Sequence, residues 1–211
     1  MKTIMCFGDS NTYGANTAID GERYDWNTRW TALLQKGLGF EKYRVIEEGL
    51  GGRTTTFDDP FNPLLNGAKG LEYALATHRP IDMITISLGT NDVRSHFNMS
   101  VPGVLKGYEK LIQMIKIDSY VNNWQMPKIL ILSPPFIGDT SECPFVLYDK
   151  SSESKMRDLI PALQKFASDN GYMYFALSSV AKTGEDNLHM DKESHRKVAD
   201  SLIEIIKESL K

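Results

Sequence analysis

Apolar runs of strand length recur along the chain, and each is followed by a segment with helical spacing. Strands are predicted at Thr3–Phe7, Tyr43–Glu48, Asp82–Leu88, Lys128–Ser133 and Tyr172–Leu177. The third and fourth runs are continuously apolar, as expected of strands that are covered on both faces.

Apolar residues at three- and four-residue spacing separate these runs. Val104, Tyr108, Leu111 and Ile115 form one such stripe, which predicts an amphipathic helix over Val101–Lys116. The remaining helices are predicted at Arg29–Leu38, Gly67–Ala76, Ser151–Asp169 and between Val198 and Leu210. Pro161 should kink or split the helix that contains it. Residues 118–127 and 136–150 are predicted to be loops.

Strands that alternate with helices favour a parallel sheet between two helical layers. The predicted fold is a three-layer α/β/α sandwich around a central parallel five-stranded sheet, formed by a single domain over residues 1–211. In such sheets ligands bind at the carboxyl ends of the strands. Residues just after each predicted strand are therefore the candidates for a functional site.

Composition narrows the functional classes. Among 211 residues the net charge is −3 and no basic stripe occurs, so nucleic acid is not an expected partner. Cys6 and Cys143 form no CxxC or Cys/His cluster, so neither a disulfide framework nor a metal site is expected, and Cys6 should be a small core residue. The N-terminal apolar run is too short for a signal peptide and no segment could span a bilayer. We expect a cytoplasmic location and no membrane partner.

Ser10 lies three residues beyond the first predicted strand, in the sequence Gly-Asp-Ser-Asn at residues 8–11. A tight turn there would present its hydroxyl at the edge of the sheet. A serine hydroxyl is a weak nucleophile that needs an adjacent base. The same four residues also form a good turn sequence with no chemical role, so the motif alone leaves both interpretations open.

His189 is the candidate base among four histidines, because Asp186 precedes it by three residues. That spacing lets the carboxylate reach the imidazole Nδ1–H and fix its tautomer. The alternative is that Asp186 or a neighbouring aspartate merely caps the last helix. Of the other histidines, His78 is expected to be a surface or cap residue, His195 is expected at the surface, and His96 could line the rim of the site.

Acyl transfer also needs hydrogen-bond donors for a developing oxyanion. Asn91, after the third strand, could offer its side-chain amide. Gly52, after the second strand, could offer a backbone N–H with no side chain to block close approach. The backbone N–H of Ser10 would be a third donor. In isolation each residue has an alternative role in shaping a turn or capping a segment.

Four such motifs follow one another in the order in which a sheet of this kind would gather them, and together they resemble the SGNH (GDSL-type) hydrolase family. Residues 8–11 resemble its first block, with Asn11 in place of the usual leucine. Gly52 matches the glycine of the second block, residues 89–92 match the G-x-N-D block, and Asp186-x-x-His189 matches the D-x-x-H block. The match extends over nearly the whole chain.

The resemblance implies a flavodoxin-like fold and esterase or acyltransferase activity without a cofactor or a metal. By matched position, Ser10 would be the nucleophile, His189 the base and Asp186 its orienting partner, with Ser10, Gly52 and Asn91 as the oxyanion hole. One departure is Glu47, which stands where the second block usually has asparagine. The function of that asparagine is therefore in question here.

Further segments, including Glu-Glu-Gly-Leu at 47–50 and Leu-Asn-Gly-Ala at 65–68, resemble the arylesterase/acetyltransferase branch of the family. This resemblance implies a small-molecule ester with a short acyl group, transfer of the acyl group to water or alcohols, and homo-oligomers. Residues that flank the motifs are candidates for the substrate pocket: Asp9, Asn11, Tyr13, Phe57 and Thr90.

Two alternatives remain. One keeps the same residues and takes acetylated carbohydrate, such as acetyl-xylan, as substrate. The other is a non-enzymatic flavodoxin-like module. A phosphoacceptor receiver would need aspartate after the third strand and lysine after the fifth, where this chain has Leu88-Gly89 and Leu177-Ser178. The chain lacks GxGxxG and P-loop motifs, and Thr12 stands where an α/β-hydrolase elbow would need glycine.

Overall fold

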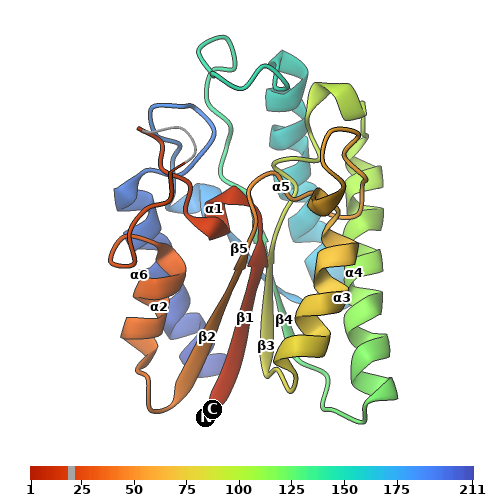
Figure 1. Cartoon of the computed structure of the whole chain (residues 1–211), viewed down its shortest axis with the longest axis vertical. Coiled ribbons are helices and arrows are strands. Elements are labelled where there is room, and N and C mark those ends of the chain that lie inside the picture. Colours follow the sequence, from red (N-terminus) through yellow and green to blue (C-terminus); the bar gives the residue numbers. More distant parts are fainter. Residues whose placement is uncertain (19–21) are drawn as a thin grey trace.

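The computed structural model describes residues 1–18 and 22–211, and its centre is one parallel sheet. The strands are β1 (Lys2–Gly8), β2 (Tyr43–Gly49), β3 (Met83–Ser87), β4 (Lys128–Ser133) and β5 (Met173–Ala176). They lie in the order β2-β1-β3-β4-β5 (Figure 1). All five predicted strands are present, and their ends differ from the prediction by one residue at most.

Helices connect the strands. They are α1 (Ser10–Tyr13), α2 (Trp30–Leu38), α3 (Gly67–His78), α4 (Val101–Val121), α5 (Lys150–Asn170) and α6 (Lys192–Ser209), with short 3₁₀ turns η1 (Pro63–Leu65), η2 (Ser95–Phe97) and η3 (Leu177–Ser179). Among the described residues, no helix is both long and apolar enough to cross a bilayer.

Two apolar cores flank the sheet, because successive side chains of a strand point to opposite faces. On β1, Ile4 and Cys6 pack with α2 and α6, whereas Met5 and Phe7 pack with α3, α4 and α5. Figure 1 shows α2 and α6 on one side of the sheet and the other three long helices on the opposite side. The predicted three-layer α/β/α fold is confirmed, as is the burial of Cys6.

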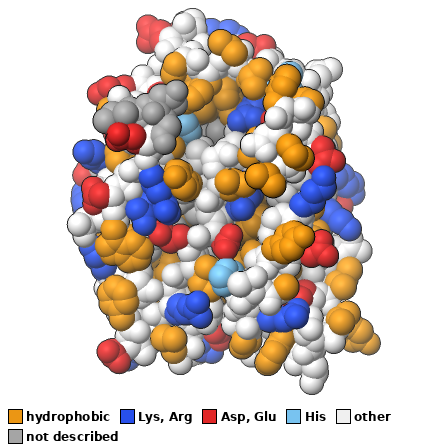
Figure 2. All heavy atoms as spheres, in the orientation of Figure 1, with side chains coloured by type: hydrophobic (Ala, Val, Ile, Leu, Met, Phe, Trp, Pro, Cys, Tyr) orange, Lys and Arg blue, Asp and Glu red, His pale blue; other side chains and the backbone are white. Residues whose placement is uncertain are grey.

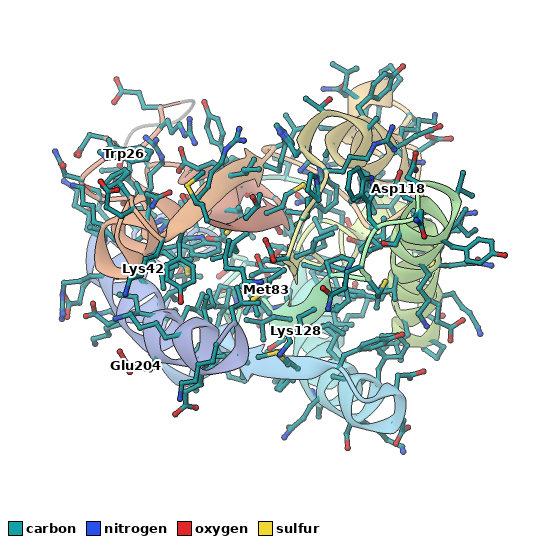
Figure 3. The ribbon with its side chains drawn as sticks, turned by 90° about the horizontal axis from the view of Figure 1, so that it is seen from below. Trp26, Lys42, Met83, Asp118, Lys128 and Glu204 are labelled. Carbon is teal, nitrogen blue, oxygen red and sulfur yellow. The ribbon has the colours of Figure 1, made fainter. Side chains whose placement is uncertain are left out.

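The strand order creates a crevice at one edge of the sheet. The chain passes from β1 to β2 on one side of the sheet centre and from β3 to β4 on the other. The connections that follow β1 and β3 therefore diverge at the carboxyl ends of these two neighbouring strands. This is the point at which open α/β sheets bind ligands. Figure 3 views the opposite end, where Lys42, Met83 and Lys128 mark the beginnings of β2, β3 and β4.

Helix α6 begins at Lys192, six residues before Val198, where the predicted apolar stripe starts, and two further helices differ from the prediction. Helix α4 continues to Val121, through part of the predicted loop, and ends where Asn123 adopts a positive φ of 56°. No proline or glycine interrupts residues 108–121, so nothing in that segment stops the helix. Helix α5 is not split at Pro161. Pro161 is exposed, and water can therefore hydrate the carbonyl that loses its helical partner.

His195 is fully buried on α6, and the prediction that it lies at the surface is wrong. Its Nδ1 accepts a hydrogen bond from the Trp30 backbone N–H at 3.3 Å, and its ring packs edge-to-face on Tyr24 with 5.4 Å between centroids. Protonation would place a charge in the core and set an Nδ1–H against the Trp30 N–H. Burial lowers the pKa of His195 to about 4, so the residue is neutral at pH 7.

The buried neutral imidazole predicts that folding stability falls with acidification. His195 has a normal pKa of 6.5 when unfolded and about 4 when folded, so the unfolded chain binds its proton more tightly. The contribution of His195 is complete above pH 6.5 and is lost as pH falls towards 4, by about 3 kcal/mol in all. Urea unfolding of wild type and His195→Gln between pH 7.5 and 4.5 measures this contribution. The difference between their free energies of unfolding should narrow as the pH falls over that range. A constant difference would contradict the prediction.

Candidate active site

Ser10 lies two residues after the end of β1 and begins the single turn of α1. The turn is capped by Asp9, whose buried carboxylate accepts a hydrogen bond from the Asn11 N–H at 2.9 Å. The turn also packs against the end of β2, so closely that a Cβ on Gly49 would come within 2.1 Å of the Tyr13 nitrogen. Only glycine fits there, and its lack of a side chain allows the turn that carries Ser10 to pack directly on the strand.

Three side chains from distant parts of the chain form one hydrogen-bonded line. The Ser10 hydroxyl lies 2.8 Å from His189 Nε2, and His189 Nδ1 lies 2.6 Å from Asp186 Oδ2. All three residues are at least nine-tenths buried. The other three histidines lie elsewhere: His78 pairs with Glu48, His96 lies 4.0 Å from Asp59, and His195 is in the core.

The Asp186 carboxylate is prepared to stay ionised. Burial favours its neutral form, but hydrogen bonding and the charge of His189 outweigh burial and lower the pKa of Asp186. Its other oxygen accepts the backbone N–H groups of Leu188 and His189, at 2.9 and 2.8 Å. An ionised carboxylate only accepts, so Nδ1 must carry the imidazole proton. Nε2 is then free to accept the hydrogen of the Ser10 hydroxyl.

Asn11 ties the nucleophile turn to the histidine segment. Its Oδ1 accepts the Met190 backbone N–H at 2.8 Å, and its own carbonyl accepts the Trp30 indole N–H at 3.2 Å. The residue is buried, follows Ser10 in the chain and bonds the residue that follows His189. Asn11 therefore holds two segments, 179 residues apart in sequence, in register.

Three donors lie around Ser10. Within residues 1–18 and 22–211, the backbone N–H groups of Ser10 and Gly52 donate to no protein acceptor. Gly52 has φ +83°, which L side chains rarely adopt, and a Cβ there would come within 2.9 Å of Leu65. The Asn91 side chain donates one amide hydrogen to the Arg53 carbonyl at 3.0 Å, and its second amide hydrogen has no protein partner there.

A cavity of about 800 Å³ opens over these groups. Figure 2 shows hydrophobic side chains gathered at this upper end of the molecule. One wall comes from residues 13–18 and Glu22, and the other from residues 144–148, with Phe145 packed edge-on to His189 at 5.4 Å between ring centroids. Its lining includes Ser10, Tyr13, Gly52, Asn91, Asp186 and His189, all expected from sequence, and also Arg94, Phe145 and Tyr148, which were not.

Four residues predicted to line the substrate pocket are not part of the cavity wall. The buried side chains of Asp9 and Asn11 bond to backbone amides, and Thr90 is also buried. Phe57 packs against Phe97, with 6.5 Å between ring centroids. Of the five residues predicted for the pocket, Tyr13 alone is in the lining. Proximity in sequence to a motif did not reveal which side of the backbone each side chain occupies.

Glu47, which departs from the family pattern that the sequence resembles, has a structural partner here. Arg29 forms a two-point ion pair with it, at 3.0 and 2.8 Å, and Thr31 donates a further hydrogen bond. Burial opposes ionisation, yet these hydrogen bonds and charges outweigh it and lower the pKa of Glu47. Arg29 also bonds the Tyr24 carbonyl at 2.9 Å. Glu47 thus anchors the segment that leads from the cavity wall into α2.

The described residues contain no group of three or more His, Cys, Asp or Glu side chains arranged to hold a metal ion. What the site does contain is a hydroxyl bonded to an oriented imidazole and N–H donors that face the same cavity. These are the elements that acyl transfer through a serine requires. In this arrangement His189 can remove the hydroxyl proton of Ser10, and the N–H donors can form hydrogen bonds to a negatively charged oxygen nearby.

Comparison with known proteins agrees with this chemistry. The model of the GDSL-like lipase/acylhydrolase family matches residues 6–197. An aryl esterase from M. smegmatis, solved in native and inhibitor-bound forms, shares 35% identity with a TM-score of 0.92, and each chain is covered completely. No curated protein sequence gives a significant match.

Two structures from Sinorhizobium meliloti are also similar. One is a carbohydrate acetylesterase with 28% identity and a TM-score of 0.92, and both chains are fully covered. The other is a carbohydrate acetylesterase family member with 34% identity, a TM-score of 0.91, and 100% and 99% coverage of this chain and that one. The family match spans most of the chain and the esterases match it end to end, so this protein belongs to the GDSL-like (SGNH) family of esterases and acylhydrolases.

Proposed function

We propose that the protein is a serine esterase that hydrolyses short-chain acyl esters through an acyl-enzyme. The observation that carries this proposal is the 2.8 Å contact between the Ser10 hydroxyl and His189 Nε2. Ionised Asp186 supports it by fixing the imidazole tautomer. In the first step, Ser10 Oγ attacks the ester carbonyl carbon and His189 takes the hydroxyl proton.

The negative charge that develops on the carbonyl oxygen needs donors. We assign these to the N–H groups of Ser10 and Gly52 and to the second amide hydrogen of Asn91. The assignment of these donors is supported because none of their hydrogens has a protein acceptor in the described part of the chain. His189 then gives its proton to the leaving alcohol oxygen as the C–O bond breaks, which leaves the acyl group on Ser10.

The acyl-enzyme is resolved when a second hydroxyl attacks it, with His189 again as base. Water gives a carboxylic acid, and an alcohol gives a new ester. Phe145, Val146, Leu147 and Leu188 make part of the cavity apolar, which gives an alcohol a surface on which to bind and compete with water. Acyl transfer is measured as the ratio of alkyl acetate to acetate released when an alcohol is added to the assay.

Replacing Ser10 by alanine should abolish hydrolysis of p-nitrophenyl acetate, because the nucleophile is removed. The expected loss in kcat is about 10⁶-fold, the order found for serine hydrolases that lose this residue. Ser201→Ala, a serine on α6 outside the cavity, is the matched control and should keep full activity. Retention of most activity by Ser10→Ala would reject the proposed function.

A series of p-nitrophenyl esters from acetate to octanoate tests the preference for short acyl groups. We expect kcat/KM to fall as the chain lengthens. The series is run with wild type and Ser10→Ala together, so that only the serine-dependent rate is compared. A rate that rises towards octanoate would contradict the short-chain assignment and leave the catalytic serine in place.

Asn91→Ala should cost about 3 kcal/mol of transition-state stabilisation, or about 160-fold in kcat/KM, because one oxyanion donor is lost. Asn170→Ala is a matched control: its amide also donates to a backbone carbonyl, at 2.9 Å, but at the end of α5 next to the beginning of β5. Steady-state kinetics of both variants measure the difference. An unchanged rate in Asn91→Ala would remove that residue from the oxyanion hole.

An acetylated carbohydrate is the second candidate substrate. Two of the similar structures are described as carbohydrate acetylesterases, and one wall of the cavity carries Asn16, Thr17 and Glu22, which could bond sugar hydroxyls. Acetate release from acetyl-xylan and from aryl acetates is compared at equal ester concentration. Faster release from acetyl-xylan would select the carbohydrate ester.

A further inference from the structure

The Asn91 side chain is held from two sides. Its Nδ2 donates to the Arg53 carbonyl at 3.0 Å, and its Oδ1 lies 2.9 Å from the Tyr148 hydroxyl. Asn91 is 2% exposed and Tyr148 is 5% exposed, so water does not readily replace either contact. Tyr148 comes from the loop before α5, 57 residues from Asn91, and the sequence contains no motif that links the two.

The orientation of this amide decides whether it donates or accepts. A carbonyl only accepts, so the group beside the Arg53 carbonyl must be the nitrogen. The oxygen then faces Tyr148, and the second N–H is left for a reactant. Were the amide to rotate, it would offer oxygen in place of nitrogen. An acceptor near a developing oxyanion repels it instead of stabilising it.

Tyr148 is itself constrained to act as the donor to Asn91. Arg94 Nε donates to the Tyr148 hydroxyl at 3.3 Å, so the hydroxyl hydrogen remains for Asn91 Oδ1. Arg94 Nη1 pairs with Asp59 Oδ2 at 3.0 Å, and the Asp59 side chain is 2% exposed. Burial raises the pKa of Tyr148 to about 12, so the phenol keeps its hydrogen at neutral pH.

The backbone on either side of Tyr148 is also fixed. Ser95 N–H and Ser95 Oγ both donate to the Leu147 carbonyl, at 2.9 and 3.0 Å. Ser152 Oγ donates to the Val93 carbonyl at 2.8 Å, and Asp149 caps α5. The segment that carries Tyr148 is thus bonded on both sides to the segment that follows Asn91. Its hydroxyl has little freedom to move relative to the amide.

We propose that Tyr148, backed by Arg94 and Asp59, is a positioning residue that fixes the Asn91 amide with its nitrogen towards the reacting carbonyl oxygen. The inference rests on the proposed esterase function and deepens it. Tyr148 itself forms no bond to the substrate oxygen in this scheme. It acts through Asn91, so its contribution should appear only when Asn91 is present.

Tyr148→Phe removes the hydroxyl and keeps the ring, so the shape of the cavity is preserved. We expect kcat for p-nitrophenyl acetate to fall about tenfold, less than the loss of a whole oxyanion donor, with KM nearly unchanged. Tyr174→Phe is the matched control, because that hydroxyl bonds Ser133 and the Ile160 carbonyl and lies outside the cavity wall. Its kcat should equal that of wild type.

A double-mutant cycle with Asn91→Ala separates positioning from a general structural effect. Tyr148→Phe should have almost no further effect on kcat in the Asn91→Ala background, because the group that it orients is gone. An equal loss in both backgrounds, or an unchanged kcat in Tyr148→Phe alone, would overturn the proposal. If Ser10→Ala abolishes hydrolysis and Tyr148→Phe leaves kcat unchanged, only the positioning role of Tyr148 is overturned. If Ser10→Ala leaves hydrolysis intact, the proposed function itself is rejected.

Binding of a short alkylboronic acid gives a second readout, independent of turnover. Boronates form a tetrahedral anionic adduct with an active serine and so place an oxygen in the oxyanion hole. Their inhibition constant should rise about tenfold in Tyr148→Phe, by the same factor as kcat falls. Equal boronate affinity in wild type and Tyr148→Phe, with both still bound through Ser10, would contradict the proposed orientation of Asn91.

Discussion

The hydrogen bond between the Ser10 hydroxyl and His189 is the contact on which the rest of the site depends. It joins the first strand to the segment before the last helix, so it exists only if the whole sheet is assembled. Each end is held by its own local bonds: Asp9 caps the serine turn, and Asp186 accepts two backbone amides of the histidine segment. Asn11 then connects the two ends directly. Local hydrogen bonds orient the Ser10 turn and the His189 segment, and the assembled sheet brings the two together.

The sequence predicted the elements whose signals are local. Strand β4 is continuous in apolar residues and its bounds agree completely with the prediction, and the order of strand and helix led to the layer architecture. The burial of His195 was missed because its polarity suggested the surface. A neutral imidazole nevertheless fits the core where Trp30 offers a backbone donor, and Trp30 lies on another helix. His195 precedes Val198 and Ala199 by three and four residues, so helical spacing already placed it on the buried face of α6, and only its Trp30 partner could not be read from that spacing.

The candidate site divides in the same way. Ser10, Gly52, Asn91 and the Asp186–His189 pair follow from short motifs at strand ends, and the structure brings them within one cavity. Arg94, Phe145 and Tyr148 could not be found from sequence, since loop contacts such as that between Ser95 and Leu147 place them. Glu47 likewise became interpretable only when Arg29 was seen to pair with it. The positions of these motif residues were therefore easier to predict from sequence than the other residues that line the cavity.

The floor and the walls of the cavity have separate supports except at Tyr148, which contacts Asn91. Strand ends hold the floor, whereas the wall of residues 13–18 depends on contacts such as Thr17 with Tyr24, and the facing wall depends on the loop before α5. Substitutions in a wall at positions other than Tyr148 can therefore alter its shape while the reactive groups keep their places. Such a division lets related enzymes diverge in what they recognise without losing their chemistry, and it makes these two segments the natural targets for redesign.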